Sequence, residues 1–252
     1  MATKEVSNHV DRLSVMRVPV DSIEADRLAA VAQELVATDG QEQIVLLRWW
    51  DFMRARRNRQ YRTCVRESLS VPVSRSVAKA ARFLAGTIPA RYMPFDLVVQ
   101  ILTSLEERSQ SVYLLGGSGA AIRVMERNVR ETFPGLRIVG RYAGFYAKEM
   151  EPSIITAIRK ASPDFLLVGP GVPGRDLWIH RHRANVGVRL ALFSAEVFDI
   201  FSERKPRTSR SAFKRGLDFI PDLIRRPWRL LRFFVYLWFL LCLLVFRVFK
   251  IR

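Results

Sequence analysis

The stretch VYLLGGSGAAIRVMERNVRETFPGLRIVGRYAGFY, residues 112–146, decides the fold. A short apolar run at 112–115 leads into a glycine-rich turn, and the apolar spacing that follows predicts a helix over 119–132. A second strand is expected at 136–140. A strand, a crossover helix and another strand in this order are typical of a parallel sheet covered by helices.

The same alternation extends through residues 1–203, so we expect one α/β domain with a Rossmann-like parallel sheet and flanking helices. The further strands are expected at 13–20, 43–50, 68–73, 164–168 and 188–193. The further helices are expected at 22–37, 74–86 with Gly86 as its end, 96–110, 151–161 and 175–184.

The composition narrows the class of partner. The 252 residues carry a formal charge of +17, which indicates an anionic partner such as nucleic acid, an acidic membrane surface or a phosphate-bearing substrate. None of the usual nucleic-acid-binding modules is recognisable, and much of the charge lies beside an apolar segment, so lipid explains it better. We expect no nucleic-acid partner.

Neither a disulfide framework nor a metal site is expected. The chain has two cysteines, Cys64 and Cys242, and the start of the chain lacks the apolar core of a secretory signal, which fits a reducing, cytoplasmic compartment. His180 and His182 are two residues apart on an expected helix and point in different directions, while His9 is remote. The sequence thus predicts no metal and no cofactor.

Residues 204–252 form an expected basic appendage with an apolar helix at 233–246. Its fourteen uncharged residues would span about 21 Å, which is shorter than the bilayer core of about 30 Å. We therefore expect a helix that lies on the membrane or inserts shallowly, with arginines at lipid phosphates. A true span, or packing in the protein's own core or in a homo-oligomer, are the alternatives.

Two glycine-rich turns are expected at the carboxyl ends of neighbouring strands. Gly116, Gly117 and Gly119 follow the strand at 112–115, and a second turn with Gly171, Pro173 and Arg175 follows the strand at 164–168. Open α/β sheets bind ligands at such edges, where helix N-termini attract phosphate. The alternative is that these glycines only make tight turns.

The segment around 96–146 followed by PDFLLVGPGVPGRDLWI, residues 163–179, resembles the WecG/TagA/CpsF family of glycosyltransferases, glycosyltransferase family 26. The opening RVPVDSI and the tail GLDFIPDLIRRPWRLLR also resemble the family's start and its C-terminal appendage. The resemblance covers nearly the whole chain.

This resemblance implies transfer of an N-acetylmannosamine-type sugar from a UDP donor to a polyprenyl-diphosphate-linked acceptor, in cell-surface polysaccharide synthesis at the cytoplasmic membrane face. It implies a donor site that includes the glycine turns, the GFY turn and arginines of the appendage. The expected substrate-binding residues are Gly116, Gly117, Gly119, Tyr146, Gly171, Pro173, Arg175, Arg229 and Arg232.

The resemblance fails at the chemistry. Val73 stands where the family has the aspartate that would accept the acceptor's proton, and Arg48 stands where the family has an asparagine. Asp96 and Asp176 are the remaining candidates for the catalytic carboxylate. Two hypotheses therefore stay open, an active transferase and a catalytically inactive relative that acts as a nucleotide-sugar-binding or membrane interaction and regulatory protein.

Overall fold

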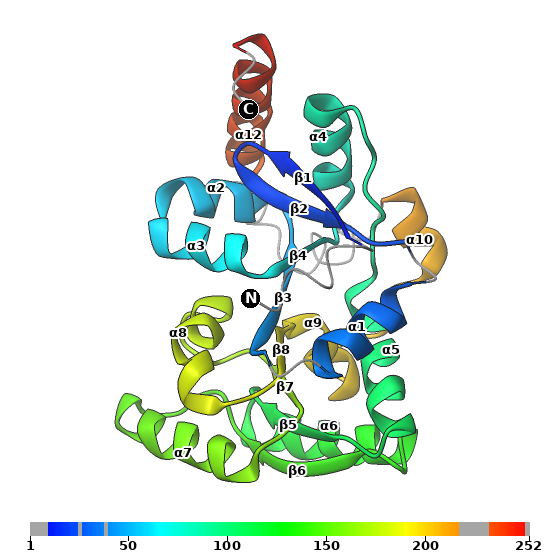
Figure 1. Cartoon of the computed structure of the whole chain (residues 1–252), viewed down its shortest axis with the longest axis vertical. Helices are drawn as coiled ribbons and strands as arrows, with labels where there is room; N and C mark the ends of the chain where they lie inside the picture. Colours follow the sequence, from blue (N-terminus) through cyan, green and yellow to red (C-terminus); the bar gives the residue numbers. More distant parts are fainter. Residues whose placement is uncertain (1–9, 25–26, 38–39, 217–231, 250–252) are drawn as a thin grey trace.

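The computed structural model describes residues 10–24, 27–37, 40–216 and 232–249. Its centre is a six-stranded parallel sheet in the order β4-β3-β8-β7-β5-β6 (Figure 1). The strands are β3 (Glu42–Leu47), β4 (Leu69–Pro72), β5 (Ser111–Leu115), β6 (Arg137–Tyr142), β7 (Phe165–Val168) and β8 (Leu190–Phe193). The α/β fold with a Rossmann-like parallel sheet is confirmed.

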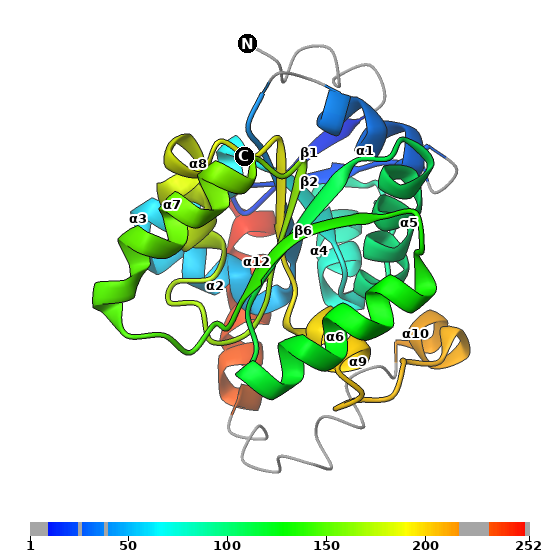
Figure 2. The same cartoon turned by 90° about the horizontal axis from the view of Figure 1, so that it is seen from below.

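Helices cover both faces of this sheet (Figure 2). One face carries α1 (Leu28–Ala37), α5 (Pro94–Glu107), α6 (Gly119–Thr132) and α9 (Ala195–Phe201). The other carries α7 (Glu151–Ala161), preceded by η3 (Lys148–Met150), and α8 (Asp176–Val186). Further along that side lie α2 (Trp49–Arg57) and α3 (Arg59–Glu67), while α4 (Arg75–Ala85) packs against an N-terminal hairpin.

Alternation along β5 shows why the strands are buried on both sides. Val112 and Leu114 pack into the core under α5 and α6, while Tyr113 and Leu115 pack into the core under α7 and α8. A strand covered on both faces needs apolar residues at every position, because successive side chains point to opposite faces. The run of apolar residues that predicted this strand has that origin.

The prediction of one opening strand at 13–20 is wrong. These residues belong to two antiparallel strands, β1 (Asp11–Val15) and β2 (Val18–Ser22), which form a separate two-stranded sheet. Met16 and Arg17 make the turn with φ of 52° and 64°, although glycine or asparagine usually takes such positions. Because no turn residue interrupts the apolar pattern, the sequence carried no signal of the reversal.

The prediction of a strand at 43–50 is wrong in its second half. The strand stops at Leu47, and Trp49 already begins α2. The Asp51 carboxylate accepts a hydrogen bond from the Arg48 backbone N–H at 2.8 Å, which satisfies a group at the helix start. The helix expected at 22–37 likewise begins later, at Leu28. By contrast, Gly86 ends α4 with φ of 79°, as expected.

The C-terminal helix α12 (Arg232–Val248) has two different faces. One stripe, formed by Tyr236, Phe239 and Leu243, packs against α2 and α4, and the Phe239 ring lies 6.0 Å from that of Phe52. The opposite face leaves large apolar side chains exposed, among them Trp238 and Leu244. The alternative of packing in the protein's own core is thus realised on one face only.

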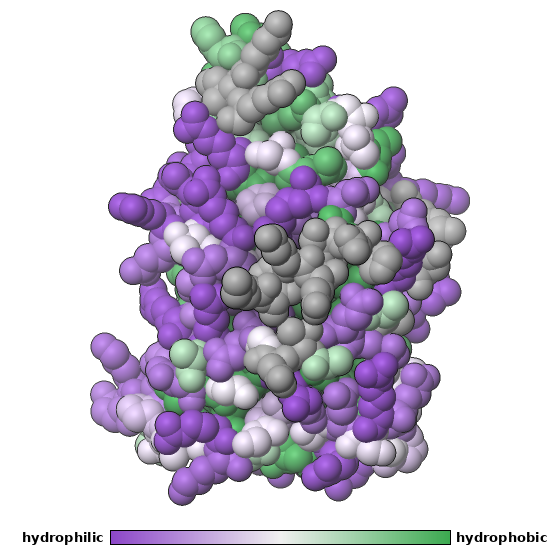
Figure 3. Space-filling view, in the orientation of Figure 1, coloured by the Kyte–Doolittle hydropathy of each residue, from purple (hydrophilic) through white to green (hydrophobic). Residues whose placement is uncertain are grey.

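This exposed face lies at one end of the molecule. Figure 1 shows α12 projecting beyond the sheet, and Figure 3 shows hydrophobic residues gathered at the same end with hydrophilic residues around them. Within the described ranges, no helix combines the length and the apolar composition that crossing a membrane requires.

We expect Phe239→Ala to lower the free energy of unfolding by about 3–5 kcal/mol, because it empties a fully buried site between α12 and α2. Leu244→Ala, on the exposed face, is the matched control and should change stability by about 0.5 kcal/mol or less. Urea denaturation of both variants measures the difference. Equal losses would contradict the packing described for α12.

Candidate functional site

Three turns interlock where β5, β6 and β7 end. The Gly117 N–H donates to the Pro170 carbonyl at 2.7 Å, and the Gly144 N–H donates to the Gly117 carbonyl at 2.8 Å. A β-carbon placed on Gly116 would lie 2.5 Å from the Gly169 Cα, so no larger residue fits there. The close approach of two backbones therefore explains why residue 116 is glycine. This is a structural role, as in the alternative that these glycines only make tight turns.

A pocket of about 360 Å³ opens beside these turns, and it receives two of the predicted residues. Gly119, the exposed first residue of α6, and Tyr146 both line it, together with Arg123 of α6. Burial, with a smaller contribution from the charge of Glu151, raises the pKa of Tyr146 to about 12. The tyrosine thus stays a neutral hydroxyl, able to donate a hydrogen bond at physiological pH.

The turn between β7 and α8 presents a cation to solvent. Pro173 and Arg175 are exposed, while Gly171 packs against the Phe145 ring. Arg175 has φ of 58°, a conformation that costs energy for a non-glycine residue, and such positions cluster at functional sites. Its guanidinium lies 5.8 Å from the centre of the Phe193 ring, at the end of β8.

A second group of residues lies at the carboxyl ends of β4, β3 and β8, and we call it the carboxyl-edge cluster: Arg48, Val73 and Glu196. The Arg48 Nη2 lies 3.2 Å from the Glu196 Oε2, and the Arg48 guanidinium lies over the Trp50 ring. Val73 is buried, and its N–H donates to the Leu47 carbonyl at 3.1 Å. The cluster therefore joins three neighbouring strands.

Asp96 is engaged elsewhere. Its carboxylate forms ion pairs with Arg207 and, at 3.4 Å, with Arg210, so it ties the start of α5 to the segment around α10 (Arg210–Arg215). This arrangement gives Asp96 a structural role in holding the end of the domain.

Asp176 belongs to a buried acidic pair between α8 and α2. Burial first, and then the charge of Asp51, raise the pKa of Asp176 to about 7. Burial also raises the pKa of Asp51, which accepts a hydrogen bond from the Tyr61 hydroxyl at 3.0 Å. Two carboxyls in one dry environment favour a shared proton.

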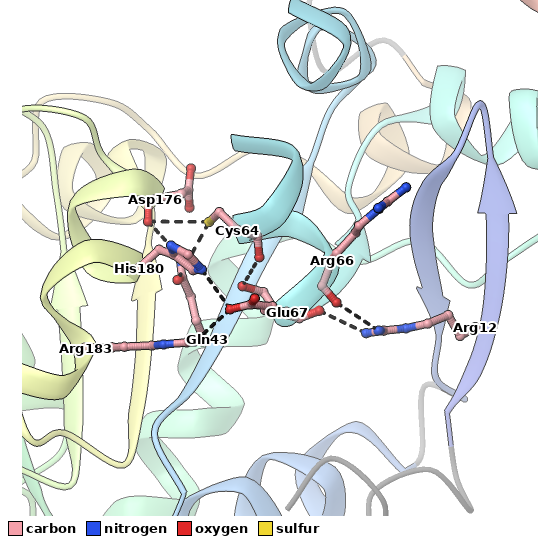
Figure 4. A network of polar contacts seen from close by, with 9 residues as sticks. Arg12, Gln43, Cys64, Arg66, Glu67, Asp176, His180 and Arg183 are labelled. Carbon is pink, nitrogen blue, oxygen red and sulfur yellow. Dashed lines mark hydrogen bonds and ion pairs between the residues drawn. The ribbon is translucent and has the colours of Figure 1, made fainter. Parts of the chain in front are cut away.

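Figure 4 shows what holds the backbone of Asp176. Its carbonyl accepts a hydrogen bond from the Gln43 side-chain N–H at 3.0 Å and a weaker one from the Cys64 thiol. Burial raises the pKa of that thiol to about 12, so it remains protonated. Asp176 is thus anchored from behind by β3 and α3, with its turn toward the carboxyl edge.

The histidines that raised the metal question contact different partners. His180 lies 3.1 Å from a Glu67 oxygen, and His182 lies 3.3 Å from a Glu151 oxygen. Among the residues that the structure describes, no group of three or more His, Cys, Asp or Glu side chains is placed to hold a metal ion.

The appendage arginines are not placed in the site. Arg229 lies outside the described residues, and Arg232 is described only as the first residue of α12. The chain before them returns over α4, because Arg75 donates to the Arg215 carbonyl and Arg91 to the Phe213 carbonyl.

The Arg48–Glu196 pair was missed by the sequence prediction. The two residues are 148 positions apart, and Glu196 belongs to no motif that the sequence analysis recognised. The available signal was the strand pattern, since residues just after parallel strands meet at one edge.

Comparison with known proteins identifies a family and its relatives. The model of the family described as Glycosyl transferase WecG/TagA/CpsF family matches residues 13–252. A protein of Bacillus spizizenii strain W23, an N-acetylglucosaminyldiphosphoundecaprenol N-acetyl-beta-D-mannosaminyltransferase, is 24% identical over 161 residues, which are 63% of this chain and 62% of that protein.

Two further relatives carry the same name. The protein of Bacillus subtilis strain 168 is 22% identical over 159 residues, 63% of this chain and 61% of the relative. That of Staphylococcus aureus strain NCTC 8325 is 20% identical over 144 residues, 57% of this chain and 56% of the relative. The chain thus spans about three fifths of the length of these relatives.

We expect Gly116→Ala to destabilise the fold by several times the roughly 1 kcal/mol of an ordinary substitution, since its β-carbon would overlap the Gly169 backbone. Gly119→Ala is the control, because the nearest atom to its β-carbon, on the Arg123 side chain, is 3.8 Å away. Thermal unfolding followed by circular dichroism compares the two. Similar melting temperatures would refute the interlocked turns.

Asp176→Asn should remove a pH dependence of stability. Because the folded-state pKa of about 7 exceeds the unfolded value of about 3.9, the folded state holds the extra proton between these values. Wild-type stability therefore falls as the pH rises from 5 to 7, by at most about 1.4 kcal/mol per pH unit from this group. In urea titrations, the free energy of unfolding of the variant should rise relative to that of wild type from pH 5 to pH 7. Parallel curves of unfolding free energy against pH for the two proteins would count against the buried pair.

Proposed function

This chain belongs to the WecG/TagA/CpsF family of glycosyl transferases, and from that premise we propose that it transfers an N-acetylmannosamine-type sugar from UDP to a polyprenyl-diphosphate-linked acceptor. The observation that carries the proposal is the family match over residues 13–252. The names of the relatives supply the sugar and the diphosphate-linked lipid, since those proteins are N-acetylmannosaminyltransferases with an undecaprenol diphosphate substrate. The setting is cell-surface polysaccharide synthesis.

The donor is proposed to lie across the interlocked turns. The pocket beside Gly119 and Tyr146 has the size for a nucleotide fragment, and the N-terminus of α6 faces anions favourably. Arg175 is exposed at the neighbouring turn and can pair with a phosphate through two N–H groups. We retain the donor residues expected from the sequence: Gly116, Gly117, Gly119, Tyr146, Gly171, Pro173, Arg175, Arg229 and Arg232.

The acceptor is a lipid, so we propose that the protein works at the cytoplasmic face of the membrane. The exposed apolar face of α12 supports this, because it combines Trp238, Leu241 and Leu244 with basic residues at either end of the helix. We further propose residues 1–203 as the catalytic-type domain and 204–252 as the membrane-associating appendage.

One observation favours a second function. Val73 is a buried hydrocarbon at the position of the family's aspartate, so it cannot take a proton from an acceptor hydroxyl. A chain that kept the donor site and lost the reaction would be a nucleotide-sugar-binding or membrane regulatory subunit. Transfer assays separate this alternative from the enzyme.

Calorimetric titration of UDP and UDP-N-acetylmannosamine into detergent-solubilised protein tests the proposal. We expect binding by the wild type and a dissociation constant about 10²–10⁴-fold higher for Arg175→Ala/Arg229→Ala, since each of the two lost charge-assisted hydrogen bonds costs about 1.5–3 kcal/mol. Arg181→Ala, on the exposed side of α8, is the control and should bind as wild type does.

Absence of nucleotide binding by the folded wild type would remove the transferase proposal. Binding without sugar transfer to a polyprenyl-diphosphate-linked N-acetylglucosamine acceptor would select the non-catalytic alternative.

A further inference from the structure

We propose that Glu196 is the general base of this protein and replaces the carboxylate that Val73 no longer supplies. The inference rests on the proposed function, because it assigns the proton-accepting group of the same transfer reaction. It adds a residue that lies outside the motifs recognised in the sequence.

Glu196 lies on the same edge of the sheet as Val73. Val73 follows β4, Arg48 follows β3 and Glu196 follows β8, and these three strands are neighbours in the order β4-β3-β8. The Val73 N–H bonds to the Leu47 carbonyl, which places the missing carboxylate next to the strand that ends at Arg48. Glu196 reaches the same strand end from the other side through its ion pair with Arg48.

A second argument is how Glu196 is held. The Ser194 hydroxyl accepts a hydrogen bond from the Val197 N–H at 3.3 Å and caps α9, which fixes the backbone on both sides of Glu196. The carboxylate then meets Arg48 at 3.2 Å, with 17% of its side chain exposed. It is therefore oriented and partly desolvated, yet it still reaches solvent, as a base that meets an incoming substrate must.

A third argument is the location of the donor groups. The guanidinium of Arg175 lies over Phe193, three residues before Glu196, and the Phe198 ring packs beneath Gly117 and Gly169. The helix that carries Glu196 is thus built into the underside of the turns proposed to hold the nucleotide. A carboxylate at this point faces the sugar end of a donor whose phosphates meet Arg175.

The other carboxylates fit the role less well. The Asp96 carboxylate at the start of α5 is already engaged in ion pairs with Arg207 and Arg210. Asp176 is 8% exposed, and the charge of Asp51 favours its protonated form. If Asp176, with its pKa of about 7, were the base, turnover would fall as the pH drops below 7. The pH dependence of turnover therefore tests Asp176 as the alternative base.

The proposed step is a single displacement. The Glu196 carboxylate takes the proton of the acceptor hydroxyl while that oxygen forms a bond to C1 of the donor sugar. The bond from C1 to the β-phosphate oxygen breaks, and its electron pair leaves with UDP. Arg48 is a positioning residue that holds Glu196 toward the carboxyl edge through their ion pair.

The test combines transfer kinetics with donor binding in Glu196→Gln. We expect turnover to fall by about 10²–10⁴-fold, the usual contribution of a general base, with UDP affinity and melting temperature close to wild type. Glu203→Gln is the matched control, because this carboxylate follows the same helix but lies near Arg127 and Asn128, away from the carboxyl edge. Its turnover should equal that of wild type.

Glu196→Ala with added sodium formate separates a base from a structural ion pair. A small carboxylate in the vacated space should restore part of the turnover in this variant and leave the wild type unchanged. Full activity of Glu196→Gln, or loss of activity that formate does not restore, would overturn the assignment and leave the transferase proposal standing. A wild-type chain that binds UDP but transfers nothing would overturn both proposals. Wild-type turnover that falls below pH 7, together with loss of turnover in Asp176→Asn, would overturn only the assignment of Glu196.

Discussion

Backbone-to-backbone contact among the turns after β5, β6 and β7 is the constraint on which the site depends. Gly116 faces Gly169, and Gly144 faces Pro170, at separations that admit no side chain. Hydrogen bonds from Gly117 to Pro170 and from Gly144 to Gly117 complete the contact. Since the strands run parallel, closing these turns on one another brings the N-termini of α6 and α8 to the same edge. That edge is where an open sheet binds its ligand.

In the other half of the same edge, the charged residues differ from those that the resemblance to the family predicts. Val73 stands where the resemblance to the family predicts an aspartate, and Arg48 is paired with Glu196 across β3 and β8. Neither change disturbs the sheet, because both lie after the strands have ended. The interlocked turns, by contrast, leave no room for a side chain at Gly116 or Gly144. The acidic pair of Asp51 and Asp176 lies behind this edge, where burial raises the pKa of both carboxyl groups.

The sequence predicted the repeating strand–helix units well, because β5 and β7 are continuous apolar runs followed by glycine, and α6 has a strong apolar period. The prediction failed where tertiary contacts decide the local structure. Met16 and Arg17 form the turn of the first hairpin without a glycine or asparagine. Helix α2 begins at Trp49 inside an apolar run, where Asp51 accepts a hydrogen bond from the Arg48 N–H. Of the candidate site, Gly119 and the turn at 171–176 could be found from local pattern, and Tyr146 from the resemblance to the family. The Arg48–Glu196 pair could not, because only the strand order brings its members together.

The central claim is that nucleotide binds at the interlocked turns, and hydrogen–deuterium exchange with and without saturating UDP measures it most directly. Phosphate bound at helix N-termini engages backbone N–H groups, so peptides covering residues 117–123 and 170–177 should exchange more slowly with UDP. Peptides of α3, which packs against α2 and β2, serve as the internal reference. Unchanged exchange at both turns, with protection elsewhere or nowhere, would contradict the account.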